Sequence, residues 1–349
     1  MRRRSPAMGL MGLAALLLVM LTLDLALGSV HIPPDDLLVI LLGGEPERPA
    51  WRQIVMLFRL PRAVTAMLAG AALSVSGLQM QTLFRNPLAG PFVLGINAGA
   101  SLGVALVVLT IGSAGTTALL GHLGLLGDLG VVIAACLGSA VVLGAVLIVS
   151  RHVQSSMTLL ILGLMFGYVT TAAVSLLLYF SIAEHIQAYL MWQFGNFGGV
   201  TWSQMKILAP TVLLGLVVAH LLAKPLNALL LGEAYAHSMG LSVKRARFCI
   251  IGSTSVLAGA VTAFCGPIGF LGVAVPHLCR GLFNTSDHRV LGPATTLMGA
   301  SLALLADLIA HLPGHQTVLP LNAVTALIGA PVVIWVILRQ RNLRRSFAA

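Results

Sequence analysis

The stretch RLPRAVTAMLAGAALSVSGLQMQTLFRNPLAGPFVLGINAGAS, residues 59–101, decides the fold class of this chain. Its first half is long and apolar enough to cross a bilayer. Small and polar residues nevertheless interrupt it, namely Gly70, Ser74, Ser76, Gly77, Gln79 and Gln81. An unsatisfied polar group in hydrocarbon costs several kcal/mol, so these residues should face other helices or a water-filled path. The pattern favours a helix that lines a translocation path over a simple membrane anchor.

The composition of the whole chain indicates a polytopic membrane protein. Of its 349 residues, 58% are hydrophobic and 9% are charged, and the mean hydropathy is +0.98, which lies outside the range of soluble globular domains. A span needs about 20 apolar residues, so we expect one all-α transmembrane domain, residues 1–349, with about ten helices. The expected spans are 7–28, 61–82, 92–112, 129–150, 157–180, 204–223, 246–265, 268–282, 291–311 and 320–339.

The basic residues orient this bundle. With the N-terminus inside, the cytoplasmic segments hold fifteen of the twenty Lys and Arg residues, which leaves Arg48, Arg52, Arg59, Arg62 and Lys206 outside. The positive-inside rule then places both termini in the cytoplasm. The net charge of +10 therefore reflects membrane topology and requires no nucleic-acid partner.

The N-terminal segment permits two interpretations. It resembles a signal peptide, and Ala26-Leu27-Gly28 resembles a cleavage site. Its apolar run of roughly twenty residues is long for a signal peptide, and an uncleaved first span fits an even number of helices. We favour the uncleaved span.

Several motifs of energy-coupled or catalytic proteins are absent from the sequence. It contains neither a G-x-x-x-x-G-K-[ST] loop nor an H-E-x-x-H motif, so we expect no ATP hydrolysis and no enzyme activity in this chain. Charged residues within the expected spans are nearly limited to Asp24 and Asp307, a narrow basis for an ion-coupled carrier. Uphill transport would draw its energy from a partner protein.

The cysteines and histidines do not form a metal-binding pattern. Cys136, Cys249, Cys265 and Cys279 contain no C-x-x-C pair, which favours packing over metal or disulfide chemistry. His311 and His315 share one expected outer loop, but isolated loop histidines are more often simply polar. We assign no metal site and no cofactor to this chain.

Residues 226–245 differ from the spans around them. This segment is amphipathic, too short to cross the membrane, and bounded by Pro225 and the basic cluster at 244–247. It predicts two short cytoplasmic helices around a break at Gly240-Leu241-Ser242. Such a pair could receive a mechanical push from a motor subunit, although a loop helix resting on the bilayer is the simpler alternative.

The chain also contains a weak internal repeat. Leu68-Ala69-Gly70-Ala71 recurs as Leu257-Ala258-Gly259-Ala260, and the expected topology makes the two spans antiparallel. Inverted repeats are common in transporters. Leu, Ala and Gly are so frequent in this chain that coincidence explains the repeat equally well.

Together these motifs resemble the permease subunits of ABC importers for iron–siderophore complexes, haem and vitamin B12. The matching segments run in family order through nearly the whole chain. They are RLPR (59–62), RNPLAGPFVLGINAGAS (85–101), FGGVTW (197–202), GEAYAHSMGLSVKRAR (232–247), GPIGFLGVAVPHLCR (266–280), DHR (287–289), GASLALLAD (299–307) and GAPVVIW (329–335).

The resemblance implies a homodimeric permease of the cell (inner) membrane, with two kinds of partner protein. One is an ATP-binding subunit dimer, which would carry ATP and Mg²⁺, and the other is a periplasmic or lipid-anchored substrate-binding protein. Docking of the binding protein would fall to Arg59, Arg62 and His311, since Arg offers a rigid fork to carboxylates. The alternative is that the arginines merely snorkel at a span end. Contact with the ATPase would fall to Gly232, Glu233, Ala236, His237, Gly240 and Leu241.

The sequence departs from the family pattern at the outer surface. His311 stands where relatives often carry a basic docking residue, and the turn Val318-Leu319-Pro320-Leu321-Asn322 lacks the usual acid and Gly. From the sequence we expect an iron-chelate importer, for a ferric siderophore or haem. Cobalamin is the alternative substrate, and an ion-coupled secondary transporter is the rival from another class. Ser74, Ser76, Gly77, Gln79 and Gln81 are the expected path residues.

Overall fold

The computed structural model describes residues 6–28, 30, 32–109, 128–152, 156–312 and 318–346. Within these residues the secondary structure is helical, without strands. The elements are α1 (Pro6–Ala26), α2 (Pro34–Leu41), α3 (Pro49–Gln53), the π-helical turn η1 (Ile54–Arg59), α4 (Leu60–Leu83), the 3₁₀ turn η2 (Pro91–Leu94), α5 (Ile96–Val108), α7 (Asp128–His152), α8 (Ser156–Tyr179), α9 (Ala183–Gln193), α10 (Trp202–Leu221), α11 (Ala223–Leu230), α12 (Glu233–Ser238), α13 (Val243–Cys265), α14 (Leu271–Phe283), α15 (His288–Ala310) and α16 (Leu321–Ser346).

The all-helical membrane fold is confirmed. Seven helical stretches among the described residues are long and apolar enough to cross a bilayer, and three shorter apolar helices occupy other expected spans: Ile96–Val108, Leu271–Phe283 and Leu321–Trp335. The end of the expected span 92–112 lies outside the described residues. The count of ten spans and the cytoplasmic position of the termini stay predictions.

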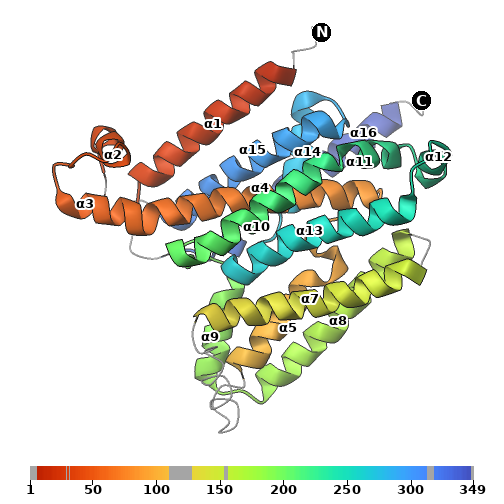
Figure 1. Cartoon of the computed structure of the whole chain (residues 1–349), viewed down its shortest axis with the longest axis horizontal. Coiled ribbons are helices and arrows are strands. Elements are labelled where there is room, and N and C mark those ends of the chain that lie inside the picture. Colours follow the sequence, from red (N-terminus) through yellow and green to blue (C-terminus); the bar gives the residue numbers. More distant parts are fainter. Residues whose placement is uncertain are drawn as a thin grey trace.

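Helix α4 forms the centre of the larger part of the bundle. It packs against α10, α13, α14 and α15, which surround it in Figure 1. Nineteen of its 24 residues are buried within the single chain. The helix therefore behaves as a core element, with other helices in place of lipid on most of its surface.

Small residues let the neighbours approach α4 closely. A Cβ atom at Gly77 would collide with the carbonyl oxygen of Gly272 on α14, and one at Gly70 would collide with that of Gly299 on α15. Such contacts between backbones are how membrane helices gain packing energy where lipid is as apolar as leucine. The glycines that interrupt the apolar run are therefore packing residues.

The helix that contains α4 begins earlier than expected. The chain is helical without interruption from Pro49 to Leu83, and the segment from Ile54 to Arg59 is a π-helical turn. At about 1.5 Å per residue, these 35 residues exceed the thickness of a bilayer core. The indole nitrogen of Trp202 donates to the carbonyl of Met56, 2.8 Å away, so a backbone group in the π turn gains a partner.

Helices α5, α7, α8 and α9 form a second group beside this core (Figure 1). Gly99 and Gly103 on α5 face Gly138 on α7 so closely that a Cβ atom at Gly103 would overlap the backbone of α7. Helix α8 lies at the edge of this group, and most of its apolar side chains are exposed. This face must meet lipid or another protein chain.

The two ends of the bundle differ. The start of α1 and the end of α16 lie toward the end that carries α11 and α12, whereas α2 and α3 lie at the opposite end (Figure 1). The short helices α2 and α9 were not predicted, because each is too short to give a span-like apolar run. The two LAGA segments lie on α4 and α13, which are in contact and run in opposite directions.

Candidate functional site

Within this single chain the polar residues of α4 bond to neighbouring helices, and their place along a translocation path stays a prediction. Gln79 accepts from the hydroxyl of Thr254 at 2.8 Å and donates to Ser253 at 3.4 Å, both on α13. Gln81 donates to the carbonyl of Val273 at 3.2 Å. These amides hold α4 against α13 and α14, because in an apolar interior each polar group must find a protein partner.

The small polar residues of α4 are buried as well. Ser74 and Ser76 are each 0% exposed and Gly77 is buried against α14. The sequence signal was real, since these residues do avoid lipid. A polar residue avoids lipid equally well by contacting another helix or by contacting water. The sequence alone does not distinguish these two arrangements.

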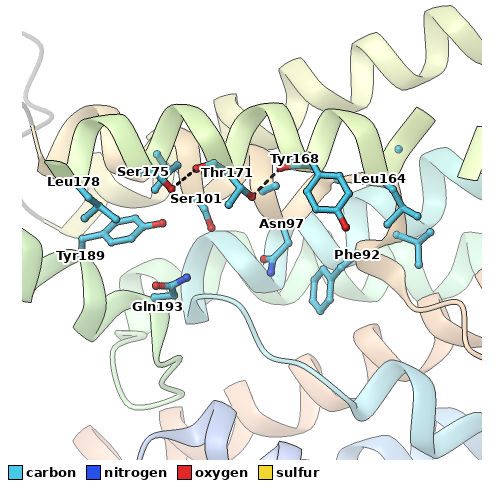
Figure 2. A pocket seen from close by; sticks show the side chains of 16 residues that line it. Phe92, Asn97, Ser101, Leu164, Tyr168, Thr171, Ser175, Leu178, Tyr189 and Gln193 are labelled. Atoms are coloured by element: carbon cyan, nitrogen blue, oxygen red, sulfur yellow. Dashed lines mark hydrogen bonds between the residues drawn. The ribbon is translucent and has the colours of Figure 1, made fainter. Parts of the chain in front are cut away.

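The structure instead forms a polar pocket between η2, α5, α8 and α9. Its volume is about 510 Å³, within the range of ligand pockets. Figure 2 shows Tyr168, Thr171 and Ser175 on α8 facing Asn97 and Ser101 on α5, with Tyr189 and Gln193 of α9 at one end. The remaining lining includes Phe92, Leu164, Val174 and Leu178.

The polar groups of this pocket form few hydrogen bonds with the rest of the protein. Thr171 and Ser175 donate their hydroxyls to carbonyls one turn earlier on α8, at 2.8 and 3.0 Å, a local bond that exposed hydroxyls readily exchange. The side-chain oxygen of Asn97 is buried without a hydrogen-bond partner. The pocket thus presents weak, replaceable hydrogen-bonding groups on an exposed helix face.

A second candidate region is a buried charge cluster where α1, α4 and α15 meet. The Nε atom of Arg62 lies 2.8 Å from Asp307, and its Nη2 atom lies 4.0 Å from Asp24. His311 lies 3.3 Å from the same Asp307 carboxylate. Both carboxylates are 1% exposed or less, so Asp307 is a buried acid beside the Arg62 guanidinium. Arg62 and His311, two predicted docking residues, therefore meet on one internal acid.

Arg59, the third predicted docking residue, is not presented outward. Its side chain is buried and donates to the carbonyls of Leu25 at 2.7 Å and Ala26 at 3.0 Å, and also to that of Val30. A cation at this position satisfies the last carbonyls of α1 and complements the negative end of the helix dipole. Its role in this structure is to cap α1, which corrects the expected exposure.

The predicted coupling segment contains the expected pair of short helices, with a different break. Residues 231–232 separate α11 from α12, and Gly232 has a φ of 109° that favours glycine. Residues 239–242, which include Gly240 at φ 85°, separate α12 from α13. The expected break at Gly240-Leu241-Ser242 thus ends the helix pair and does not divide it.

A groove of about 540 Å³ runs between α12 and the start of α13. Glu233, His237, Gly240 and Leu241 line it, as does Arg247, whose Nη2 lies 2.9 Å from Glu233. Ala236 is fully buried in this chain, and its expected contact with the ATPase stays a prediction. Two residues that the sequence did not single out are exposed beside this groove. Tyr235 on α12 is 53% exposed, and Met239, which follows α12, is 62% exposed.

Hydrogen bonds fix this segment to the bundle. Asn227 on α11 donates to Asp287 at 2.6 Å and accepts from the backbone N–H of His288 at 2.9 Å. Asp287 also caps α15 by accepting from the backbone N–H of Arg289. These bonds to the charged form lower the pKa of the Asp287 carboxyl. Short polar contacts therefore join α11 to the start of α15.

No group of three or more His, Cys, Asp and Glu side chains suited to a metal ion occurs in the part of the chain that the structure describes. His315, considered above, lies outside that part. The sulfur atoms of Cys265 and Cys279 are buried, whereas Cys136 and Cys249 are exposed.

Known proteins match this chain along nearly its full length. Residues 16–339 match the FecCD transport family. The vitamin B12 import system permease protein BtuC of Klebsiella pneumoniae is 37% identical over 349 residues, covering 98% of this chain and 97% of the relative. The protein of the same description from Escherichia coli K12 is 35% identical over 330 residues, covering 95% and 94%.

Solved structures match as well. One, described as an inward-facing conformation of a metal-chelate type ABC transporter, has a TM-score of 0.81 and 29% identity, and the match covers 95% of this chain and 98% of that one. Another, PsaBC from Streptococcus pneumoniae in complex with Fab, has a TM-score of 0.52 at 16% identity over 80% and 90% of the two chains and shares the fold alone.

Family, membrane setting and helical architecture therefore agree. The chain belongs to the FecCD transport family and is a multi-pass membrane permease of an ABC importer.

Proposed function

We propose that this chain is the permease subunit of a vitamin B12 (cobalamin) importer. The observation that carries the proposal is the identity of 35–37% to vitamin B12 permeases over nearly the whole of both chains. The sequence alone favoured an iron chelate, because the motifs are shared by the whole family. A ferric chelate becomes the second candidate, favoured by the likeness to a metal-chelate type transporter.

The polar pocket supports this proposal as part of the substrate path. Cobalamin is a large solute with many amide groups, and Asn97, Thr171, Ser175 and Gln193 can exchange hydrogen bonds with amides. The pocket is too small to enclose such a molecule, and it opens on the exposed face of α8. Two copies that face each other across α8 would join two such surfaces into one path, so the proposal includes a homodimer.

The remaining regions receive roles in the same mechanism. The ATPase subunit, which carries ATP and Mg²⁺, pushes the groove formed by Glu233, His237, Gly240 and Leu241, and Tyr235 and Met239 extend that contact. The push travels through α11 to α15. At the other end of α15, docking of the substrate-binding protein acts on Arg62 and His311, which share Asp307.

Transport assays with a panel of solutes test the substrate. The chain would be produced with its ATPase and binding protein in cells that lack their own corrinoid and siderophore permeases. We expect ATP-dependent accumulation of labelled cobalamin, and none when the ATPase is inactivated. Accumulation of a ferric siderophore or haem without cobalamin would overturn the assignment. Uptake that survives ATP depletion but stops with an ionophore would indicate a secondary transporter.

A further inference from the structure

A small basic pocket lies where α4 ends beside α11 and α14. Its volume is about 250 Å³. The lining residues are Gln81, Thr82, Arg85, Pro87, Leu230, His277 and Arg280. This pocket is separate from the polar pocket of α8 and from the groove of α12, and neither the docking nor the coupling mechanism uses it.

Arg280 brings a charge into this pocket without an acid to balance it. One of its terminal nitrogens donates to the side-chain oxygen of Gln81 at 2.5 Å, and the amide nitrogen of Gln81 is bound to Val273. Among the described residues, no carboxylate oxygen lies within 4.0 Å of Arg280 or Arg85. A largely enclosed guanidinium that is paired only with a neutral amide favours an external anion.

Arg85 adds a second guanidinium in an unusual backbone conformation. It follows the last turn of α4 with a φ of 48°, a left-handed position where glycine or asparagine is usual and other residues cost about 1–2 kcal/mol. The backbone N–H of Asn86 bonds to the carbonyl of Gln81 at 3.1 Å, so the end of α4 holds Arg85 in this conformation. Glycine at position 85 would relieve the strain but would remove the second charge from the pocket.

The turn after Arg85 is held rigidly in place. The backbone N–H of Leu88 donates to the side chain of Asn86 at 2.9 Å, and a ring nitrogen of His277 lies 2.7 Å from the carbonyl of Pro87. These two contacts close the turn at Asn86-Pro87. Leu88 is 48% exposed, so an apolar side chain stands next to the basic pocket.

We propose that this pocket binds the phosphate group of an anionic membrane lipid, held between Arg85 and Arg280. Two planar guanidinium groups match the geometry of phosphate oxygens, and basic pockets between spans suit anionic headgroups. The adjacent exposed leucine suits an acyl chain. Because Leu230 of α11 lines the same pocket, a bound headgroup would bridge α4, α14 and the coupling segment.

Native mass spectrometry of the purified full-length chain tests this proposal. The chain would be titrated with phosphatidylglycerol, with phosphatidylcholine, and with inorganic phosphate. We compare the unaltered chain with Arg280→Gln, Arg85→Gln and, as control, Arg289→Gln, which removes an equal charge from an exposed site outside the pocket. We expect roughly tenfold weaker phosphatidylglycerol binding for each pocket variant, as for the loss of a charge-assisted hydrogen bond, and no change for the control.

Each possible outcome either supports or overturns the lipid site. Preference for phosphatidylglycerol over phosphatidylcholine, lost in Arg85→Gln and Arg280→Gln alone, supports the lipid site. Equal binding by all variants overturns it. Displacement of the lipid by millimolar inorganic phosphate would assign the site to a free anion and would also overturn the lipid claim. Since Arg280→Gln removes an internal bond to Gln81, Arg85→Gln decides the matter if Arg280→Gln fails to fold.

Discussion

Replacing Arg62 should destabilise the isolated chain, because the structure binds this residue to internal acids. At 2.8 Å from Asp307, the Coulomb attraction is about 6 kcal/mol for an effective dielectric constant of about 20. Desolvation offsets much of this, but removing one partner of a buried pair typically costs about 3–5 kcal/mol. Arg62→Gln leaves Asp24 and Asp307 without their shared cation. A residue that serves only to dock a partner would show no such loss.

The assay is thermal unfolding of the detergent-purified chain, followed with a thiol-reactive dye. Replacing exposed Cys136 and Cys249 by Ser leaves the buried Cys265 and Cys279 as reporters. Arg62→Gln and Asp307→Asn should each lower the unfolding temperature by several degrees. Residues in one charge network couple by about 0.5–3 kcal/mol, so the double variant should lose less than the sum of the two.

The matched control is Arg52→Gln, because Arg52 is an exposed arginine on α3 with the same change of charge. It should unfold at the temperature of the unaltered chain. If Arg62→Gln behaves like this control, the internal cluster contributes nothing to stability and the reasoning is refuted. Additive losses in the double variant would likewise exclude a direct pair.

Three further predictions follow from other regions of the chain. Gly77→Leu should destabilise the folded chain by at least about 1–3 kcal/mol, because the added side chain overpacks against α14. Gly252→Leu should not, because Gly252 has open space around it. Thermal unfolding measures both variants. The pKa of the Asp287 carboxyl is lowered, so its stabilising effect is complete above the ordinary pKa of about 3.9 and is lost as the pH falls through the lowered pKa. The difference in unfolding temperature between the unaltered chain and Asp287→Ala should therefore disappear in acid. A difference that grows in acid would contradict the capping role. Met239→Glu should abolish uptake without lowering the unfolding temperature, and normal ATP-driven uptake would exclude a contact there.

The sequence predicted the fold class well because a bilayer imposes strong constraints. A span needs a fixed length of apolar residues, and the expected ranges for α7, α8 and α10 lie within two residues of the observed helices. The sequence did not predict that the helix containing α4 begins at Pro49, because polar and apolar residues mix in 49–60. In this segment a π turn and a hydrogen bond from Trp202 provide partners for backbone groups.

The site was harder to predict, because the sequence does not say which neighbour satisfies a polar group. The sequence correctly predicted that Gln79 and Ser76 avoid lipid, and in this chain they are buried among neighbouring helices. The pocket on α8 was missed because Thr171 and Ser175 look like ordinary helix residues whose hydroxyls bond backward. Arg62 and Asp307 were both noted, but their separation of 245 positions hid the pair.

The position of the path is the central claim, and cysteine accessibility tests it most directly. Ser175→Cys on α8 and Ser76→Cys on α4 are the same chemical change. Ser175 is exposed, whereas Ser76 is 0% exposed. Both would be made in the assembled transporter on a background without Cys136 and Cys249, and treated with a water-soluble thiol reagent during transport. The account predicts that Ser175→Cys is labelled and is protected by cobalamin, while Ser76→Cys is not labelled. Labelling of Ser76→Cys with Ser175→Cys unreactive would return the path to α4 and contradict the account.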